Sequence, residues 1–286
     1  MAQNQAEVDA FHKSAFPNAN EMRKYLTTES ESWDKVWANG LTPWEAGTSD
    51  IQPPLRWLVE SGEVPFPKEG KALVPGCGRG FDTIYLASAL GWKTVLGYDV
   101  STTAVAAAND FLKTKGVPPS VAASVKFDAV DFFKLDLPDE EKFDLIYDYT
   151  FYVAIPPSMR PAWGSQMQSL VKPGGYLITL MFPHVPEPYK LGPPFWSSFE
   201  NYVEVLGGSN GSGGANGWEI VYNKIPPLEI QSEVHKGKDR MVVWRRVFKR
   251  TQLLKGFRYN ETQFGFNMPD KFWLQHAGIR HGLPQR

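Results

Sequence analysis

The chain has few of the residues that build disulfides and metal centres. Its 286 residues include one cysteine, Cys77, so no intrachain disulfide can form. The five histidines are scattered and match no metal-site spacing: His12, His184, His235, His276 and His281. We therefore expect no metal cofactor, and we expect a reducing compartment, most simply the cytoplasm.

Long apolar runs and a dominant charge are also missing. No apolar run approaches a membrane span, and polar residues interrupt every apolar stretch up to Tyr25, so neither a membrane anchor nor a signal peptide is expected. The net charge is -1, from 30 basic and 31 acidic residues. Such a balance provides no electrostatic footprint for nucleic acid or an anionic membrane, and we expect neither as a partner.

Sequence motifs for covalent catalysis are absent. The chain contains no G-x-S-x-G nucleophile elbow and no Walker-type phosphate loop. Cys77 lies inside a glycine-rich turn, where a small residue is needed, and no histidine is near it in sequence. We interpret Cys77 as structural, and nothing in the sequence points to a covalent intermediate.

The stretch from residue 71 to residue 101 has the pattern of a strand, a glycine turn, a helix and a second strand. The turn is G-x-G-x-G, formed by Gly76, Gly78 and Gly80. Apolar residues with strand or helical spacing flank it at 72–74, 81–90 and 94–98. Glycine lets the backbone turn tightly and leaves room for a ligand. The alternative is a glycine-rich turn that binds nothing.

The acid that ends this unit indicates the kind of ligand. Asp99 follows the second strand, and an acid roughly 20 residues after such a turn is placed to accept hydrogen bonds from ribose hydroxyls. Dinucleotide enzymes use G-x-G-x-x-G, but here Phe81 occupies the place of the last glycine. The shorter turn disfavours NAD and suits a cofactor without phosphate, S-adenosylmethionine (SAM).

Strands and helices continue to alternate after Asp99. Further strands are predicted at 125–130, 143–147 and 176–182, and a closing hairpin at 218–222 and 241–248. The pattern predicts an α/β fold with a doubly wound, mostly parallel sheet and a closing antiparallel hairpin. Ligands bind such sheets beyond the carboxyl ends of the strands, so we expect Gly76, Asp99, Asp131 and Tyr149 to line one crevice.

Composition divides the chain into three parts. Residues 1–30 are mixed and polar and predict a flexible N-terminal arm with a short helix near 8–14. Residues 31–250 form the main domain, in which the low-complexity run 207–217 predicts a mobile linker. Residues 251–286 form a C-terminal extension with no motif.

Aromatic residues are concentrated at two places near the expected crevice. Trp33 and Trp37 share one face of a short helix that Ser32 would cap, and Trp44 follows. Indoles attract a sulfonium and can cover adenine, which predicts a lid; a helix packed on the sheet edge fits the spacing equally well. After the third strand, Asp131 can bond the adenine amino group and Phe132 can cover its ring. The alternative for Asp131 is a plain helix cap.

Several of these segments resemble a known family. W-x-x-x-W-x-x-G-x-T-P-W-x-x-G at 33–47 is similar to the start of the thiopurine S-methyltransferase family, particularly its plant-type thiol and halide methyltransferase branch. LVPGCGRGFD at 73–82, FDLIYDYTFYVAI at 143–155 and LVKPGGYLITLMFP at 170–183 also resemble it. Pro75 replaces the acid that most class I methyltransferases have before the first glycine, as is usual in this family.

The resemblance implies a SAM-dependent enzyme that methylates a small soft nucleophile: a thiol, hydrosulfide, thiocyanate or halide. The transfer would be an in-line displacement that leaves S-adenosylhomocysteine. By position, the cofactor contacts fall on Trp33, Trp37, Trp44, Gly76, Gly78, Asp99, Asp131, Phe132 and Tyr149. The alternatives are an O- or N-methyltransferase for a larger metabolite and a non-catalytic SAM-binding protein. We expect a monomer or a weak homodimer.

The acceptor side is predicted to be a dry aromatic pocket, because water stabilises separated charges better than the half-neutralised transition state. Arg160 and Tyr149 are the predicted catalytic residues. Arg160 is the cation that would lower the pKa of a thiol, and its alternative is a surface salt bridge. The other wall residues are expected to be Phe151, Tyr152, Trp163 and Tyr189.

Overall fold

The computed structural model describes residues 5–45, 50–184, 192–195, 197–207 and 217–247. All of them belong to one compact unit, Met1–Val247. Three predictions fall wholly or largely outside the described residues and stay predictions. They concern Tyr189 as a wall residue, the linker at 207–217 and the extension at 251–286.

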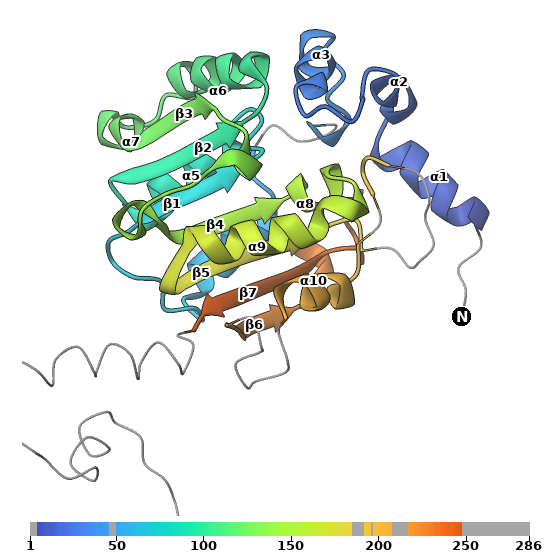
Figure 1. Ribbon diagram of the computed structural model, residues 1–286. Helices are drawn as coiled ribbons and strands as arrows, with labels where there is room; N and C mark the ends of the chain where they lie inside the picture. The colour runs from blue at the N-terminus through green and yellow to red at the C-terminus, as the bar shows by residue number, and fades with distance from the viewer. Residues whose placement is uncertain (1–4, 46–49, 185–191, 196, 208–216, 248–286) are drawn as a thin grey trace, which may run out of the picture. The chain divides into compact units, whose positions relative to one another are not determined.

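A seven-stranded sheet forms the centre of this unit, in the order β3-β2-β1-β4-β5-β7-β6 (Figure 1). Its strands are β1 Lys71–Pro75, β2 Thr94–Asp99, β3 Val125–Ala129, β4 Phe143–Tyr149, β5 Val171–Met181, β6 Trp218–Lys224 and β7 Arg240–Arg246. The first five strands pair in parallel, and β7 runs antiparallel to both β5 and β6. This topology confirms the predicted doubly wound sheet with its closing hairpin.

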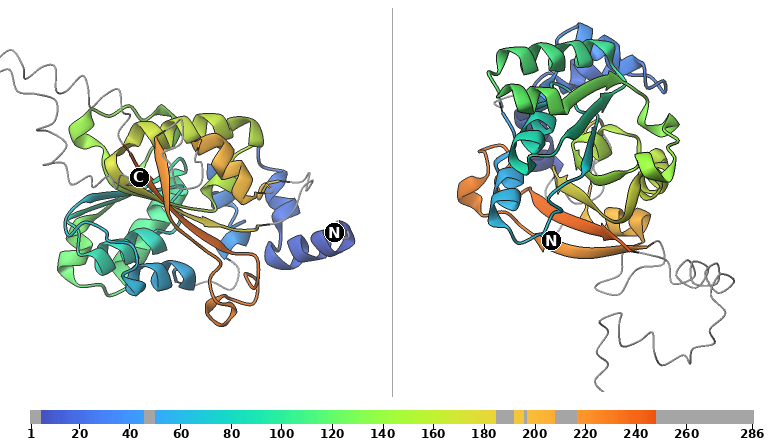
Figure 2. Two further views of the ribbon diagram at one scale, coloured as in Figure 1. Left: turned by 90° about the horizontal axis from the view of Figure 1, so that it is seen from below. Right: turned by 90° about the vertical axis from the view of Figure 1, so that its left-hand side faces the viewer.

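Helices cover both faces of the sheet (Figure 2). They are α1 Gln5–Ala15, α2 Ala19–Arg23, α3 Ser32–Ala38, α4 Pro53–Ser61, α5 Phe81–Leu90, α6 Thr102–Thr114, α7 Pro119–Ser124, α8 Phe151–Ala154, α9 Arg160–Leu170 and α10 Phe199–Leu206. Figure 1 shows α3 beyond the carboxyl end of β2, and α1 and α2 beyond that of β4. Within the described part of the chain, no helix has the length and apolarity to span a membrane.

Strand β1 shows why the sheet needs cover on both sides. Ala72 and Val74 lie in the core cluster that contains α5 residues such as Ile84. Leu73 lies in the opposite cluster, with Trp163 of α9. Successive residues of a strand point to opposite faces, so a strand buried on both faces reads as a continuous apolar run.

The start of β5 differs from the prediction. The sequence analysis began this strand at Tyr176, after the Pro-Gly-Gly turn. In the structure β5 begins at Val171, which pairs with Phe143 of β4. The register between the two strands then shifts between Phe143 and Leu145, so the turn residues are absorbed as an irregularity within the strand.

The end of β4 is fixed by a buried carboxylate. Asp148 accepts hydrogen bonds from the Trp163 indole N–H at 2.8 Å and from the Tyr152 backbone N–H at 3.1 Å. Burial raises the pKa of Asp148 to about 6, although both bonds lower it. The Tyr152 ring stacks on Tyr202 at 3.9 Å between centroids. Asp148 therefore joins β4, α8 and α9 in the core.

Trp163→Phe removes the donor to Asp148. We expect the free energy of unfolding to fall by about 1–3 kcal/mol for the unpaired carboxylate, in addition to the loss from reduced packing. Asp148 has a folded pKa of about 6, so its charged form, which needs the donor, is populated above that pH. The loss should therefore be larger at pH 8 than at pH 5 in urea unfolding.

Trp218→Phe is the matched control for this change. Trp218 is also fully buried, and its indole nitrogen has no hydrogen-bond partner among the described residues. This variant should lose packing energy with little dependence on pH. Equal pH dependence in the two variants would contradict the role given to the Trp163 indole.

Candidate functional site

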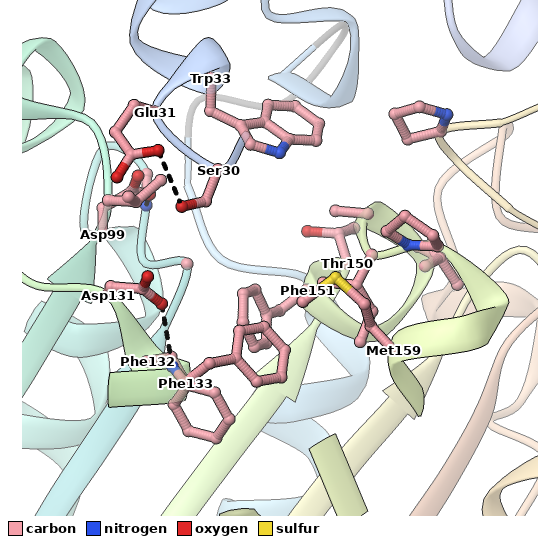
Figure 3. A pocket seen from close by; sticks show the side chains of 18 of the residues that line it. Ser30, Glu31, Trp33, Asp99, Asp131, Phe132, Phe133, Thr150, Phe151 and Met159 are labelled. Carbon is pink, nitrogen blue, oxygen red and sulfur yellow. Dashed lines mark hydrogen bonds between the residues drawn. The ribbon is translucent and has the colours of Figure 1, made fainter. Parts of the chain in front are cut away.

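A cavity of about 390 Å³ lies at the carboxyl ends of the parallel strands (Figure 3). Gly76 follows β1, Asp99 ends β2 and Asp131 follows β3; all three line the cavity, together with Thr150 after β4. Its volume is in the range of small-molecule sites. It lies where the strand order reverses, between β1 and β4, as expected for ligands of doubly wound sheets.

Asp99 lines this cavity and is held in place by two backbone hydrogen bonds. Its Oδ2 accepts a hydrogen bond from the Gly78 N–H at 3.0 Å, and its Oδ1 accepts one from the Ser101 N–H at 2.9 Å. Burial raises the pKa of Asp99 to about 6, against the lowering effect of these bonds. Each carboxylate oxygen has a second lone pair. Asp99 can therefore also accept hydrogen bonds from hydroxyl groups in the cavity.

The glycine turn is in close contact with aromatic rings. Gly76 and Gly78 have φ angles of 58° and 52°, a region that residues with a Cβ rarely adopt. A Cβ on Gly78 would lie 3.2 Å from Cζ2 of Trp37, and one on Gly76 would lie 2.7 Å from Cδ2 of Phe151. Glycine is thus required both by the turn and by the rings beside it.

Three amides of the turn are engaged within the protein. Besides the Gly78 amide, the Cys77 N–H donates to the Tyr98 carbonyl at 3.0 Å, and the Gly80 N–H donates to the Cys77 carbonyl at 2.9 Å. A pyrophosphate site requires such amides to point at the ligand. The turn is therefore better suited to a ligand that has no phosphate.

Three tryptophans form one wall of the cavity. The Trp44 ring contacts both Trp33 and Trp37, with centroids 5.8 and 5.7 Å apart. Figure 3 shows Trp33 across the cavity from the rings of Phe132 and Phe133. The sequence left open whether these tryptophans cover a ligand or belong to a helix packed on the sheet edge. In the structure the three indoles line the cavity.

A carboxylate anchors the tryptophan helix α3. Asp34 Oδ1 accepts hydrogen bonds from the Ser101 hydroxyl at 2.7 Å and the Thr103 N–H at 2.9 Å. The Thr103 bond is the main cause of a lowered pKa for Asp34. The predicted Ser32 cap is wrong by one residue: Glu31 holds the N-cap position, and the Ser32 hydroxyl accepts from the Thr27 N–H at 3.2 Å instead.

Asp131 performs the role of a cap at the edge of the cavity. Its Oδ1 accepts a hydrogen bond from the Phe133 N–H at 3.0 Å, and its Oδ2 lies 3.1 Å from the Lys134 ammonium. The sequence analysis considered such a cap as the alternative to adenine binding by Asp131. Asp131 also lines the cavity, so capping and ligand contact are compatible. Phe132 is buried beside it, with its ring edge-on to Phe151 at 5.2 Å.

The residues predicted for the acceptor wall lie in different surroundings. Phe151 lines the cavity, whereas Tyr152 and Trp163 are fully buried behind it and bond Asp148 instead. Arg160 is 4% exposed, with its guanidinium carbon 4.4 Å from the Tyr152 ring centroid, and is not a lining residue. This burial excludes the surface salt bridge considered for Arg160 and favours a structural role over thiol activation.

Tyr149 contacts a histidine and is not among the residues that line the main cavity. Its hydroxyl oxygen lies 3.2 Å from His235 Nε2, and His235 Nδ1 lies 2.7 Å from Asp239 Oδ1. Burial raises the pKa of Tyr149 well above its usual value, so the hydroxyl stays protonated. Tyr149 lines a smaller cavity behind the glycine turn rather than the main one.

The N-terminal segment contributes residues that the sequence analysis missed. It was predicted to be a flexible arm, yet Phe16 and Met22 are buried and line the cavity. The Arg23 guanidinium donates to the Pro193 carbonyl at 3.0 Å, and Pro193 lines the same cavity as Phe16 and Met22. The sequence signal for these two residues was their apolar character within a largely polar segment.

Thr150 is a second residue that the sequence analysis missed. It lines both cavities and has a φ angle of 66°, which is uncommon for a residue with a branched Cβ. Its hydroxyl donates to the Tyr149 carbonyl at 2.6 Å. Such backbone strain concentrates at functional sites.

Metal ligation and a reactive thiol have little support in the described residues. No group of three His, Cys, Asp or Glu residues that could hold a metal ion occurs among them. Burial, followed by the charges of Asp99 and Asp82, raises the pKa of Cys77 well above its usual value. Cys77 is therefore a protonated thiol at neutral pH.

Asp34→Ala should loosen the tryptophan wall. We expect a loss of about 1–2 kcal/mol in the free energy of unfolding near pH 7, as for other helix-capping carboxylates. Because the folded pKa of Asp34 is lowered, its contribution is present above the unfolded value and is lost as pH falls below about 4. Chemical unfolding of Asp110→Ala, an exposed acid on α6, serves as the control and should differ little from the parent.

Comparison with known proteins identifies the family. A family model described as thiopurine S-methyltransferase matches residues 28–212. The probable thiol methyltransferase 2 of Arabidopsis thaliana is 40% identical over 202 residues, which are 71% of this chain and 78% of the relative. Thiocyanate methyltransferase 1 of the same plant is 34% identical over 256 residues, covering 86% of this chain and 100% of the relative.

Solved structures share the fold at lower identity. A structure from work on the conversion of a disulfide into a thioacetal in echinomycin biosynthesis has a TM-score of 0.58 and 21% identity, over 82% of this chain and 99% of that chain. The glycopeptide N-methyltransferase MtfA, solved with S-adenosylhomocysteine, has a TM-score of 0.52 and 14% identity, over 70% of this chain and 91% of that one. On the family model and the identity to its relatives, the chain belongs to the thiopurine S-methyltransferase family.

Proposed function

We propose that this protein transfers the methyl group of SAM to a small soft nucleophile, a thiol or hydrosulfide first and thiocyanate or a halide second. The observation that carries the proposal is the environment of Asp99. A buried carboxylate that lines the cavity lies beside a turn in which three amides donate to groups of the protein. Two relatives, named for thiol and thiocyanate methyl transfer, support the choice of acceptor.

The lining residues fit SAM by chemistry. Asp99 would accept the ribose hydroxyls, and Asp131 would accept a hydrogen bond from the adenine amino group. Phe132 would pack against the adenine ring. The indoles of Trp33 and Trp44 would cover the ligand and lie near its sulfonium, since aromatic faces attract cations. When bound, SAM supplies an electrophilic methyl group on a cationic sulfur.

The other end of the cavity is suited to exclude water. Phe16, Met22, Val153, Ile155 and Pro193 line it, and all are apolar. An apolar surround disfavours separated charges more than a transition state in which they are partly neutralised. The residues at this end therefore favour an anion meeting a sulfonium, and their main contribution is to hold the two in line.

The charge of the acceptor end favours nucleophiles that ionise readily. Among the described residues that line the cavity, Lys134 is the one basic side chain, and it pairs with Asp131 at the adenine end. No lining cation is therefore placed to lower the pKa of a bound thiol. Acidic thiols, hydrosulfide and thiocyanate, which are substantially anionic near neutral pH, fit this environment best.

Asp99→Ala tests the cofactor part of the proposal. We expect the Kd for SAM, measured by calorimetry, to rise about 100-fold, as for the loss of charged hydrogen bonds of about 3 kcal/mol. Asp99→Asn keeps one acceptor oxygen and should fall in between. The pKa of Asp99 is about 6, so the affinity of the parent should also decline from pH 7 to pH 5 as the carboxylate is protonated. Parent-like binding by Asp99→Ala would refute the assignment.

A panel of acceptors tests the reaction. SAM turnover is measured with hydrosulfide, aliphatic and aromatic thiols, thiocyanate and iodide, with volatile methylated products quantified. We expect product from hydrosulfide and thiols, with rates that follow the ionised fraction of each thiol. SAM binding without product from any of these acceptors would favour a larger-metabolite methyltransferase or a non-catalytic protein.

A further inference from the structure

Thr150 lies where the main cavity meets the smaller cavity of about 60 Å³ behind the glycine turn. Trp44, Gly76 and Gly78 also line both cavities, so Thr150 is beside the turn at the point where the two adjoin. Figure 3 shows Thr150 across the main cavity from Asp99. We propose that the side-chain oxygen of Thr150 contacts the transferable methyl group of SAM and orients it for transfer. The inference rests on the proposed function and adds to it a residue at the reacting atoms.

The backbone of Thr150 has a conformation that favours glycine. Its φ angle is 66°, a region that a residue with a branched Cβ rarely adopts. Among the residues that the structure describes, Asn18 is the only other non-glycine residue with a positive φ, and asparagine tolerates this region. Such strain persists only where the surrounding structure enforces it. The strained backbone therefore gives the Thr150 side chain a fixed direction at the edge of the cavity.

The hydroxyl of Thr150 does not act as a helix cap. Thr150 holds the N-cap position of α8, where a threonine oxygen ordinarily accepts from the second or third amide of the helix. Thr150 makes no such bond, and the second amide, that of Tyr152, donates to Asp148 Oδ1 at 3.1 Å instead. Because Asp148 provides the cap, the oxygen of Thr150 is left for another partner.

The hydrogen of this hydroxyl is used by the backbone. Thr150 Oγ1 donates to the Tyr149 carbonyl at 2.6 Å. A hydroxyl has one donor and two acceptor lone pairs, so the oxygen can offer only acceptor capacity to a ligand. The methyl hydrogens of a sulfonium share its positive charge, which makes them C–H donors to such an oxygen. A neutral thioether such as S-adenosylhomocysteine has no methyl group to donate.

The other hydroxyls that line the main cavity have a different position. They belong to Thr27, Thr28 and Ser30, which precede α3, and these residues do not line the smaller cavity. With the ribose at Asp99 and the sulfonium beside the glycine turn, as proposed above, Thr150 is the hydroxyl residue on the sulfonium side. Thr28 is an exposed member of the other set and provides a matched control.

The transfer changes no covalent bond of Thr150. A lone pair of the anionic acceptor forms the new bond to the methyl carbon. The bond from this carbon to the sulfonium sulfur breaks and leaves its electron pair on that sulfur. An oxygen fixed beside the methyl hydrogens limits the directions in which the carbon can face, and alignment of this kind accounts for much of the rate of a displacement.

The experiment compares the Kd values of SAM and S-adenosylhomocysteine, measured by calorimetry without an acceptor. Thr150→Val keeps the shape of the side chain and removes the oxygen, whereas Thr150→Ser keeps the oxygen. We expect Thr150→Val to bind SAM about 5- to 10-fold more weakly than the parent, as for a weak hydrogen bond strengthened by charge, and to bind S-adenosylhomocysteine like the parent. Thr150→Ser and the control Thr28→Val should keep the parent's ratio of the two Kd values.

Thr150→Gly is a second variant without the oxygen. Glycine adopts a φ of 66° without strain, so this variant should fold even if Thr150→Val does not. It should show the same loss of preference for SAM. An unchanged ratio in the variants that lack the oxygen, or an equal loss for both ligands, would overturn the inference and leave the proposed function standing. If the parent bound neither ligand, the proposed function and this inference would both fail.

Discussion

The part of the cavity proposed to bind SAM depends on the hydrogen bonds of one buried carboxylate, Asp99. Asp99 accepts from the Gly78 and Ser101 amides and so joins the glycine turn to the start of α6. The Ser101 hydroxyl donates in turn to Asp34, between Trp33 and Trp37. The turn, the strand end and the tryptophan wall are thus connected through adjacent side chains. A carboxylate this buried is stable only with several donors, and a ribose would add two more.

Much of the fold, and several residues that line the cavity near Asp99, could be predicted because their signals are local. The glycine turn and Asp99 have a fixed spacing that follows from strand and helix lengths. The helix α5 spans the residues 81–90 whose apolar spacing predicted it. Trp33, Asp131 and Phe132 were placed correctly beside the cavity because strand ends in a parallel sheet meet at one edge.

The part of the cavity beyond β4 could not be predicted because it depends on tertiary contacts. Whether a residue after β4 faces the cavity or the core is decided by Asp148, which draws Tyr152 and Trp163 inward and leaves Phe151 on the wall. Arg160 follows the same helix into the core. Phe16 reaches the site through contacts with Phe182, more than 150 residues away in sequence, and no local pattern reports such a contact.

The most direct test of the account is a crystal structure of the protein with S-adenosylhomocysteine. The account predicts ribose hydroxyls within hydrogen-bond distance of Asp99 and adenine beside Phe132. It also predicts the sulfur between the glycine turn and the tryptophan wall. A ligand bound elsewhere, or bound with its ribose away from Asp99, would contradict the central claim that this carboxylate organises the site.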